Sequence, residues 1–248
     1  MRRFLVLFLL TVAGLVSAAA SCGPAAPVPD PVITSVSLPP SEAVQTVRAA
    51  TAMLATTAVH FELTVNREVA LEGNADPAAD VAEVTGPLGR VPSSRRVGGD
   101  LYVKPPSSAG WIHLEIARIT GASANLALLR LATQMLVLHG LSAAVETSPG
   151  HFDCRADLDL AAAQASAADE PIVKALIVSA HLRGNEALPF QVTVDGQRRL
   201  TSLFYVLGGA TATMSYTLTL SKHGQPVSVQ RPPAAEVTEA SPAQYRTL

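Results

Sequence analysis

Aromatic residues and charges are both scarce in this chain. Aromatic side chains make up 4% of the sequence and charged ones 15%, whereas 48% of the residues are hydrophobic. The interior must therefore be built mainly from Ala, Val and Leu, which fill space less completely per residue than aromatic rings do. Such a composition favours a roomy interior, although a GC-rich genome would enrich the same residues without any cavity.

Basic patches are also missing. The formal net charge is -2, and no stretch combines Lys and Arg with interleaved aromatic residues. Proteins that bind nucleic acid concentrate positive charge on one face or along one segment. The sequence therefore argues against nucleic acid as a partner.

Local catalytic motifs are absent as well. The six histidines are far apart, and none forms HExxH or another paired metal-binding spacing. There is no GxSxG elbow, no glycine-rich phosphate loop and no CxxC. Asp153, Asp157 and Asp159 alternate along one segment, as acids on the solvated side of a strand do. We therefore expect a protein that is not an enzyme and needs neither a metal nor another cofactor.

Cysteine occurs only twice, and the first one follows a leader. Met1-Arg2-Arg3 precedes the apolar run Phe4–Leu15, and small residues continue to Ser21. A run this short predicts a secretory signal peptide over residues 1–21 rather than a membrane-spanning helix. Small residues directly before a cysteine resemble a bacterial lipobox, in which Cys22 becomes the first residue and carries palmitate-like acyl chains. Ordinary cleavage after an A-x-A-like site, which leaves Cys22 as a thiol, is the alternative.

Acylation of Cys22 would anchor the protein to the cell membrane on its extracytoplasmic face, within the cell envelope. Each buried methylene contributes roughly 0.8 kcal/mol, so several chains give durable attachment. Residues 22–40 are rich in proline and nearly uncharged, which predicts a tether before a domain that begins near Ser41. Cys154 is then expected as a small buried residue. If acylation fails, a Cys22–Cys154 disulfide is the alternative.

Alternation of apolar and polar residues predicts strands in two blocks. The first block opens at Val59–Val65, which runs into a hairpin near Asn66-Arg67. Further strands are expected at Asp80–Thr85, Leu101–Lys104 and Trp111–Ile116. The Pro/Ser/Arg-rich stretch Gly86–Gly99 is expected as a turn.

The second block opens with a strand at His151–Leu160 and continues as a meander over residues 191–230. Turns are expected at Asp195-Gly196 and His223-Gly224, because both dipeptides tolerate a positive φ. One strand of the meander places Met214, Tyr216 and Leu218 on a single face. A final strand at Pro226–Gln230 is expected to end in a flexible tail over residues 234–248.

Helical periodicity is found in three segments. Ser41–Thr57 predicts an amphipathic helix with Ser41 as its cap. Asn125–Leu141 is apolar on most sides and predicts a helix that is buried or covers an apolar cavity. The Ala-rich stretch before Leu182 predicts a broken helix. Together these elements predict an α+β fold over residues 41–233, with a strongly curved antiparallel sheet, or half-barrel, and helices on its concave face.

The order of these elements resembles that of one known family. The terminal Cys, the Pro-rich tether, Gly99-Asp100-Leu101-Tyr102-Val103 with Trp111, and Ser221-Lys222-x-Gly224 with Pro232-Pro233 are similar to the mycobacterial LppX/LprG/LprA/LprF lipoproteins. The resemblance covers nearly the whole mature chain. It implies a half-barrel, similar to periplasmic lipoprotein carriers, that takes acylated lipids or glycolipids from the inner membrane towards the outer envelope. An inner-membrane transporter is a candidate partner.

The wall of the expected lipid cavity follows from strand parity and from the position of the apolar helix. An envelope carrier needs an enclosed apolar slot, because each lipid methylene exposed to water costs roughly 0.8 kcal/mol. The expected wall residues are Val59, Phe61, Leu63, Leu101, Val103, Ile112, Leu114, Leu129, Met135, Leu136, Met214, Tyr216 and Leu218. Alternatively, these side chains fill the space themselves, and the protein is a solid-cored envelope lipoprotein that docks a transporter or wall protein.

Overall fold

The computed structural model describes residues 40–86, 91–106, 108–119, 129–165, 174, 177–178, 187–208 and 213–246. The expected signal peptide, the expected acylation site Cys22 and almost all of the expected tether lie outside these residues. Most of the helix expected before Leu182 also lies outside them.

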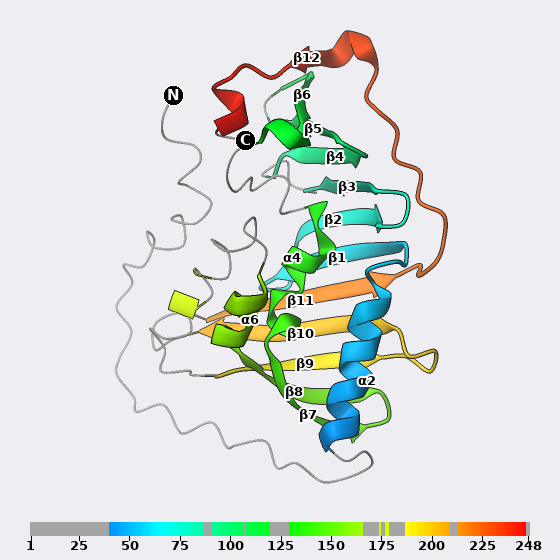
Figure 1. Ribbon diagram of the computed structural model, residues 1–248, viewed down its shortest axis with the longest axis vertical. Coiled ribbons are helices and arrows are strands. Elements are labelled where there is room, and N and C mark those ends of the chain that lie inside the picture. Colours follow the sequence, from blue (N-terminus) through cyan, green and yellow to red (C-terminus); the bar gives the residue numbers. More distant parts are fainter. Residues whose placement is uncertain are drawn as a thin grey trace.

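Twelve strands form one open sheet (Figure 1). Every neighbouring pair is antiparallel except β12 and β6, which are parallel. The sheet is mixed rather than antiparallel throughout, and it is not strongly curled. The strands follow one another in space as β12 (Val237–Glu239), β6 (Trp111–Glu115), β5 (Asp100–Lys104), β4 (Ser93–Val97), β3 (Val81–Thr85), β2 (Glu68–Asp76), β1 (Val59–Val65), β11 (Thr213–Ser221), β10 (Leu200–Gly208), β9 (Ala187–Val194), β8 (His151–Asp157) and β7 (Leu141–Ser148).

The β1–β11 pair joins the two strand blocks that the sequence predicts. β1 pairs with β2 on one side and with β11 on the other. Asn66 closes the β1–β2 hairpin with φ 51°, and Arg67 follows with φ 69°. The Asn66 side-chain oxygen accepts a hydrogen bond from the Ser215 backbone N–H at 2.9 Å. This residue therefore makes the expected tight turn and also fastens the turn to the second block.

Helices occupy one face of the sheet. Figure 1 shows α2 (Pro40–Met53) lying across the strands from β7 to β10, with α4 (Leu131–Gln134) and α6 (Leu158–Gln164) on the same face. α5 (Leu136–His139) contacts α6 and β8. Short 3-10 helices follow β6 at Ile116–Arg118 and flank β12 at Ala234–Glu236 and Gln244–Arg246. The fold is thus mostly β, with few helices.

The helix expected over Asn125–Leu141 is broken in the described part of the chain. Met135 interrupts it between α4 and α5 with φ -111° and ψ 22°. Gly140 follows α5 as its C-cap. A glycine is needed there, because a Cβ at this position would lie 2.1 Å from the Asp157 carbonyl oxygen. Leu141 then begins β7, an edge strand that the sequence interpretation missed because its Ala- and Ser-rich sequence carries little alternation.

Two other strand expectations are wrong. The segment expected as a turn over Gly86–Gly99 contains the half-buried strand β4. Its Ser and Arg residues give no alternation of apolar and polar side chains that would indicate a strand. Pro226–Gln230, expected as a strand, is not one, because this segment pairs with no neighbouring strand in the described structure. The turn before it is present, with Lys222 at φ 52° and Gly224 at φ 71°. The expected Asp195-Gly196 turn is a longer loop in which Arg198 takes the positive φ of 61°.

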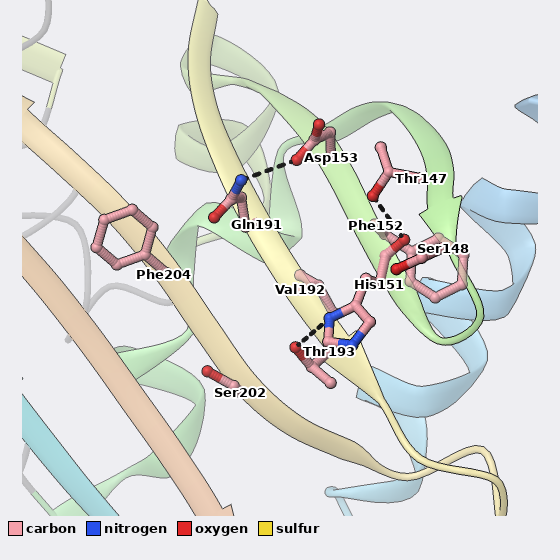
Figure 2. Close-up of a pocket in the computed structure, with 10 residues that line it drawn as sticks. All are labelled: Thr147, Ser148, His151, Phe152, Asp153, Gln191, Val192, Thr193, Ser202 and Phe204. Atoms are coloured by element: carbon pink, nitrogen blue, oxygen red, sulfur yellow. Dashed lines mark hydrogen bonds between the residues drawn. The ribbon is translucent and has the colours of Figure 1, made fainter. Parts of the chain in front are cut away.

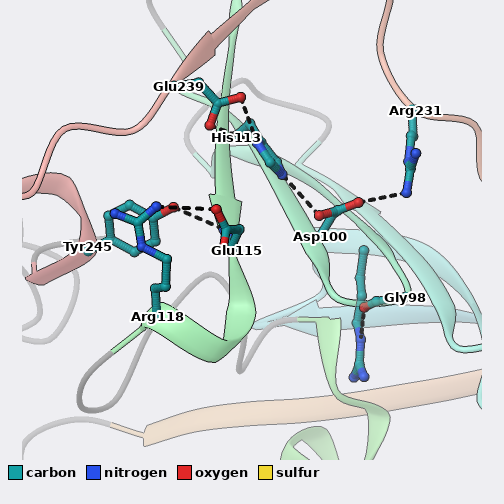
Figure 3. A network of polar contacts seen from close by, with 9 residues as sticks. Gly98, Asp100, His113, Glu115, Arg118, Arg231, Glu239 and Tyr245 are labelled. Carbon is teal, nitrogen blue, oxygen red and sulfur yellow. Dashed lines mark hydrogen bonds and ion pairs between the residues drawn. The ribbon is translucent and has the colours of Figure 1, made fainter.

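The C-terminal segment expected as a flexible tail is part of the fold. β12 pairs with β6, so the folded unit continues past the expected boundary at Pro233. Tyr245 is buried, and its hydroxyl accepts a hydrogen bond from the Glu115 backbone N–H at 3.1 Å (Figure 3). The Arg118 guanidinium lies 4.3 Å from the centre of the Tyr245 ring. Packing of this ring against β6 holds the tail in place.

A histidine clasp also fastens this segment. His113 on β6 lies between two carboxylates, with Nδ1 2.9 Å from Glu239 of β12 and Nε2 3.1 Å from Asp100 of β5 (Figure 3). Asp100 also pairs with Arg231 at 2.7 Å. Desolvation lowers the pKa of His113, but the hydrogen bonds to Glu239 and Asp100 outweigh it and raise the pKa above the ordinary 6.5. Only the protonated ring donates to both carboxylates.

The clasp predicts a pH-dependent stability. Because the folded-state pKa of His113 is raised, its contribution is complete below about pH 6.5 and is lost as the pH rises through the folded-state value. In urea unfolding, the difference in unfolding free energy between wild type and His113→Gln should therefore shrink as the pH rises above about 6.5. Parallel stability profiles for the two proteins would contradict the clasp.

Candidate functional site

The face of the sheet under the helices carries continuous apolar rows. One row passes through register partners on five adjacent strands: Phe152 on β8, Val192 on β9, Leu203 on β10, Leu218 on β11 and Leu63 on β1. Side chains of directly opposite residues lie roughly 5 Å apart and pack against each other. The row therefore forms an unbroken apolar strip across the centre of the sheet.

A neighbouring row is built from aromatic residues and a cysteine. Cys154, Phe190, Tyr205 and Tyr216 are successive register partners on β8 to β11. The rings of Tyr205 and Tyr216 stack with centroids 5.0 Å apart and planes 10° apart. Burial raises the pKa of the Tyr205 phenol, with a further contribution from Tyr216, so this side chain is uncharged.

Cys154 is a free, buried thiol, as expected of a small core residue. Burial, assisted by the charge of Asp153, raises its pKa to about 12. A thiol that stays protonated is neither nucleophilic nor a ready metal ligand. Cys154 therefore serves packing in this apolar row.

Helix α2 covers the outer strands of the second block through small residues. Ala43, Val47 and Ala50 are fully buried and recur at helical spacing, so the helix lies close to the sheet. Arg48 donates from Nη2 to the Leu141 carbonyl oxygen of edge strand β7 at 3.0 Å. This bond fixes α2 to the sheet edge and occupies an edge acceptor.

Most of the expected wall residues lie in one contiguous hydrophobic cluster. Leu136 is buried outside the cluster, and Met214 and Tyr216 are half-buried at one end of β11. The members of the expected wall that share the cluster are Val59, Phe61, Leu63, Leu101, Val103, Ile112, Leu114, Leu129, Met135 and Leu218. The structure thus brings together residues from β1, β5, β6, β11 and the helical segment.

The sequence interpretation left out the apolar residues of β8 to β10. Phe152, Phe190, Val192 and Leu203 are buried in the same cluster and complete its rows. Their alternation was visible in the sequence, and the same parity rule would have assigned them to the wall.

Four apolar or aromatic residues of the covered face are only partly buried at the end of the β10–β11 pair. Tyr205, Leu207, Met214 and Tyr216 lie there, and all four are only half-buried. Leu207 and Met214 are register partners. We call these four residues the hairpin mouth. It is a place where apolar side chains of the covered face reach solvent.

One polar group interrupts the apolar face. Ser94 on β4 is fully buried between its register partners Val84 and Val103. Its hydroxyl has no hydrogen-bond partner among the described residues. A buried unpaired hydroxyl costs roughly 1–3 kcal/mol, so such a group calls for a physical reason.

The opposite face of the sheet is polar and hollowed. Two cavities of about 400 and 310 Å³ lie there over β7 to β10. Among the described residues, no group of three or more His, Cys, Asp or Glu side chains is arranged to hold a metal ion. None of the described helices is long and apolar enough to cross a membrane.

Comparisons with known proteins find similarity among solved structures. No protein-family model and no curated protein matches this chain. The crystal structure of LprF from Mycobacterium bovis is similar, with a TM-score of 0.47 and 16% identical residues. The alignment covers 78% of this chain and 98% of LprF. LprF is one of the lipoproteins that the sequence motifs resemble.

The unpaired hydroxyl of Ser94 yields a stability prediction. Ser94→Ala removes a hydroxyl that loses its hydration on folding without gaining a hydrogen-bond partner. The free energy of unfolding of the ligand-free protein should therefore rise by about 1 kcal/mol. Ser93→Ala is the matched control, because alternation along β4 points Ser93 to the other face, and its effect should stay within ~0.5 kcal/mol. Urea denaturation measures both. A loss of stability in Ser94→Ala alone would show that the hydroxyl has a partner in the ligand-free protein.

Proposed function

We propose that the helix-covered face binds the acyl chains of a lipid or glycolipid and that the protein carries or presents this lipid between the inner membrane and the outer envelope. The observation that carries the proposal is the continuous apolar face that reaches solvent at the hairpin mouth. In this proposal the acyl chains lie between the open sheet and the helices that cover it, and the protein is not an enzyme.

The cover is suited to opening. α4 and α5 have four residues each and α6 has seven. Helices this short are held by packing rather than by their own hydrogen bonds. Moving them from the sheet costs the contacts of buried residues such as Met135 and Leu138, and acyl methylenes that replace these contacts contribute roughly 0.8 kcal/mol each.

Ser94 supplies a polar feature within this apolar face. The Ser94 hydroxyl has no hydrogen-bond partner among the described residues. An ester or hydroxyl group of a lipid bound beside β4 would supply one. Such a bond would orient the ligand, because apolar contacts are not directional.

Membrane attachment completes the proposal. Residues 1–21 would direct export, acylated Cys22 would hold the protein on the extracytoplasmic face, and the Pro-rich residues 22–40 would act as a tether. An inner-membrane transporter would hand over the lipid.

A charge at the hairpin mouth should block lipid entry. We expect Leu207→Arg to weaken binding of the fluorescent fatty acid cis-parinaric acid by ~tenfold or more, about 1.4 kcal/mol, because a charge on an apolar wall loses hydration. Thr213→Arg is the matched control, since Thr213 neighbours Met214 but is exposed, and alternation along β11 points it to the other face. Equal affinities of the two variants would contradict a ligand path through the mouth.

Loss of the acylated cysteine should release the protein. Cys22→Ala, expressed in the native host, is expected in the soluble fraction after cell breakage, whereas wild type stays with the membranes. Cys154→Ala is the control and should remain membrane-bound. Unchanged membrane partitioning of Cys22→Ala would contradict the anchor.

A further inference from the structure

The two cavities on the helix-free face adjoin and form one groove. The cavity of about 400 Å³ and the cavity of about 310 Å³ share Asp153, Gln191 and Phe204. These three residues are register neighbours on β8, β9 and β10. Each cavity has the size at which protein pockets begin to hold small ligands, roughly 300 Å³.

One end of the groove is lined by hydroxyls and an imidazole. Figure 2 shows His151, Thr193 and Ser202 on adjacent strands, with His151 Nδ1 3.4 Å from the Thr193 hydroxyl. Ser148 and Ser202 each lie at a register shift, one in the β7–β8 pair and one in the β9–β10 pair. Such bulges increase local twist and are common beside binding sites. Both residues line the cavity at this end of the groove.

The centre of the groove joins planar polar groups to an aromatic ring. Gln191 Nε2 donates to Asp153 Oδ1 at 3.0 Å, which fixes both side chains (Figure 2). Asp153 Oδ2 and Gln191 Oε1 have no hydrogen-bond partner among the described residues, and both residues line the groove. Phe204 stands beside Gln191 on the next strand and is only half-buried.

The other end of the groove is apolar. Ala143, Val145, Pro189 and Val206 line it, and Arg155 adds one positive charge to the same cavity. Val206 is one of the three large hydrophobic residues that the described structure exposes. A ligand that fills the whole groove must therefore be polar at one end and apolar at the other.

We infer that this groove binds a neutral saccharide unit against Phe204, Asp153 and Gln191, with an apolar substituent of the sugar in the neighbouring cavity. A sugar presents hydroxyls that donate and accept, and an apolar face of C–H groups. Asp153 offers hydrogen-bond acceptors, and Gln191 and the hydroxyl groups both donate and accept. The Phe204 ring can contact the C–H face of the sugar. Asp153 and Arg155 give the groove one negative and one positive side chain, so its charge favours a ligand without net charge.

The inference goes beyond the proposed function, because the groove lies on the face that the helices leave uncovered. Leu203 and Phe204 are consecutive residues of β10, so the first belongs to the covered face and the second to the groove, and Val192 and Thr193 on β9 alternate in the same way. The cavity lining also includes Phe152, Val192, Cys154, Phe190 and Tyr205, which strand parity places on the covered face. A saccharide in the groove and an acyl chain under the helices would occupy opposite sides of the same sheet.

Amide NMR titration of the chain with Cys22→Ala tests the inference. The probes are methyl β-glucoside, methyl α-mannoside and methyl β-galactoside, and octyl β-glucoside below its micellar concentration. At least one methyl glycoside should shift the amides of residues 147–153 and 191–204. Octyl β-glucoside should bind at least tenfold more tightly than methyl β-glucoside and also shift residues 143–145 and 206, which would identify an alkylated sugar, as in a glycolipid, as the preferred source over a free saccharide.

Variants separate this site from the lipid face. Phe204→Ala and Asp153→Asn should each weaken glycoside binding at least fivefold and leave cis-parinaric acid binding unchanged. Thr217→Ala is the control, since Thr217 is the register partner of Phe204 outside the groove. The inference is overturned if no glycoside shifts the groove amides, if the shifts map to the helix-covered face, or if Phe204→Ala binds as wild type does.

Discussion

Pairing of β1 with β11 is the interaction on which the rest of the structure depends. It brings together segments about 150 residues apart, as the Asn66–Ser215 hydrogen bond shows with a separation of 149. Closing so long a loop costs chain entropy, and the pair offsets that cost through apolar partners such as Leu63 and Leu218. Without this pair the apolar rows of the two blocks would end at exposed edges. With it they become one surface.

Strict alternation along the strands gives the two faces of this surface opposite chemistry. The covered face is apolar from β8 to β6, and Ser94 stands out as a buried hydroxyl without a partner among the described residues. The other face carries linked polar groups, such as His60, Asn74 and Glu83, whose side chains are joined by hydrogen bonds across β1, β2 and β3. Because a strand cannot change the parity of one residue without a bulge, an acyl site and a sugar site can coexist on the same strands.

The sequence predicted the parts of the fold that depend on clear periodicity. Val59–Val65, the Asn66-Arg67 turn and the face shared by Leu101, Val103 and Leu114 all follow from alternation and turn chemistry, and the structure confirms them. β7 and β4 were not predicted, because Ala, Ser and Arg give weak alternation. The helix over Asn125–Leu141 was predicted too long, because it is interrupted at Met135 and ends at Gly140, which lies close to the Asp157 carbonyl. Docking of β12 depends on Tyr245 and His113, which are distant in sequence and carry no local signal. The groove around Phe204 depends on register, which only the folded sheet sets.

The measurement that tests the central claim most directly is organic extraction of the protein purified from its native envelope, followed by mass spectrometry of the extract. If the helix-covered face holds acyl chains, the extract should contain an acylated lipid in stoichiometric amount, and Leu207→Arg should lose it while Thr213→Arg keeps it. A wild-type protein that is free of lipid would contradict the account and favour a solid-cored lipoprotein that docks an envelope partner.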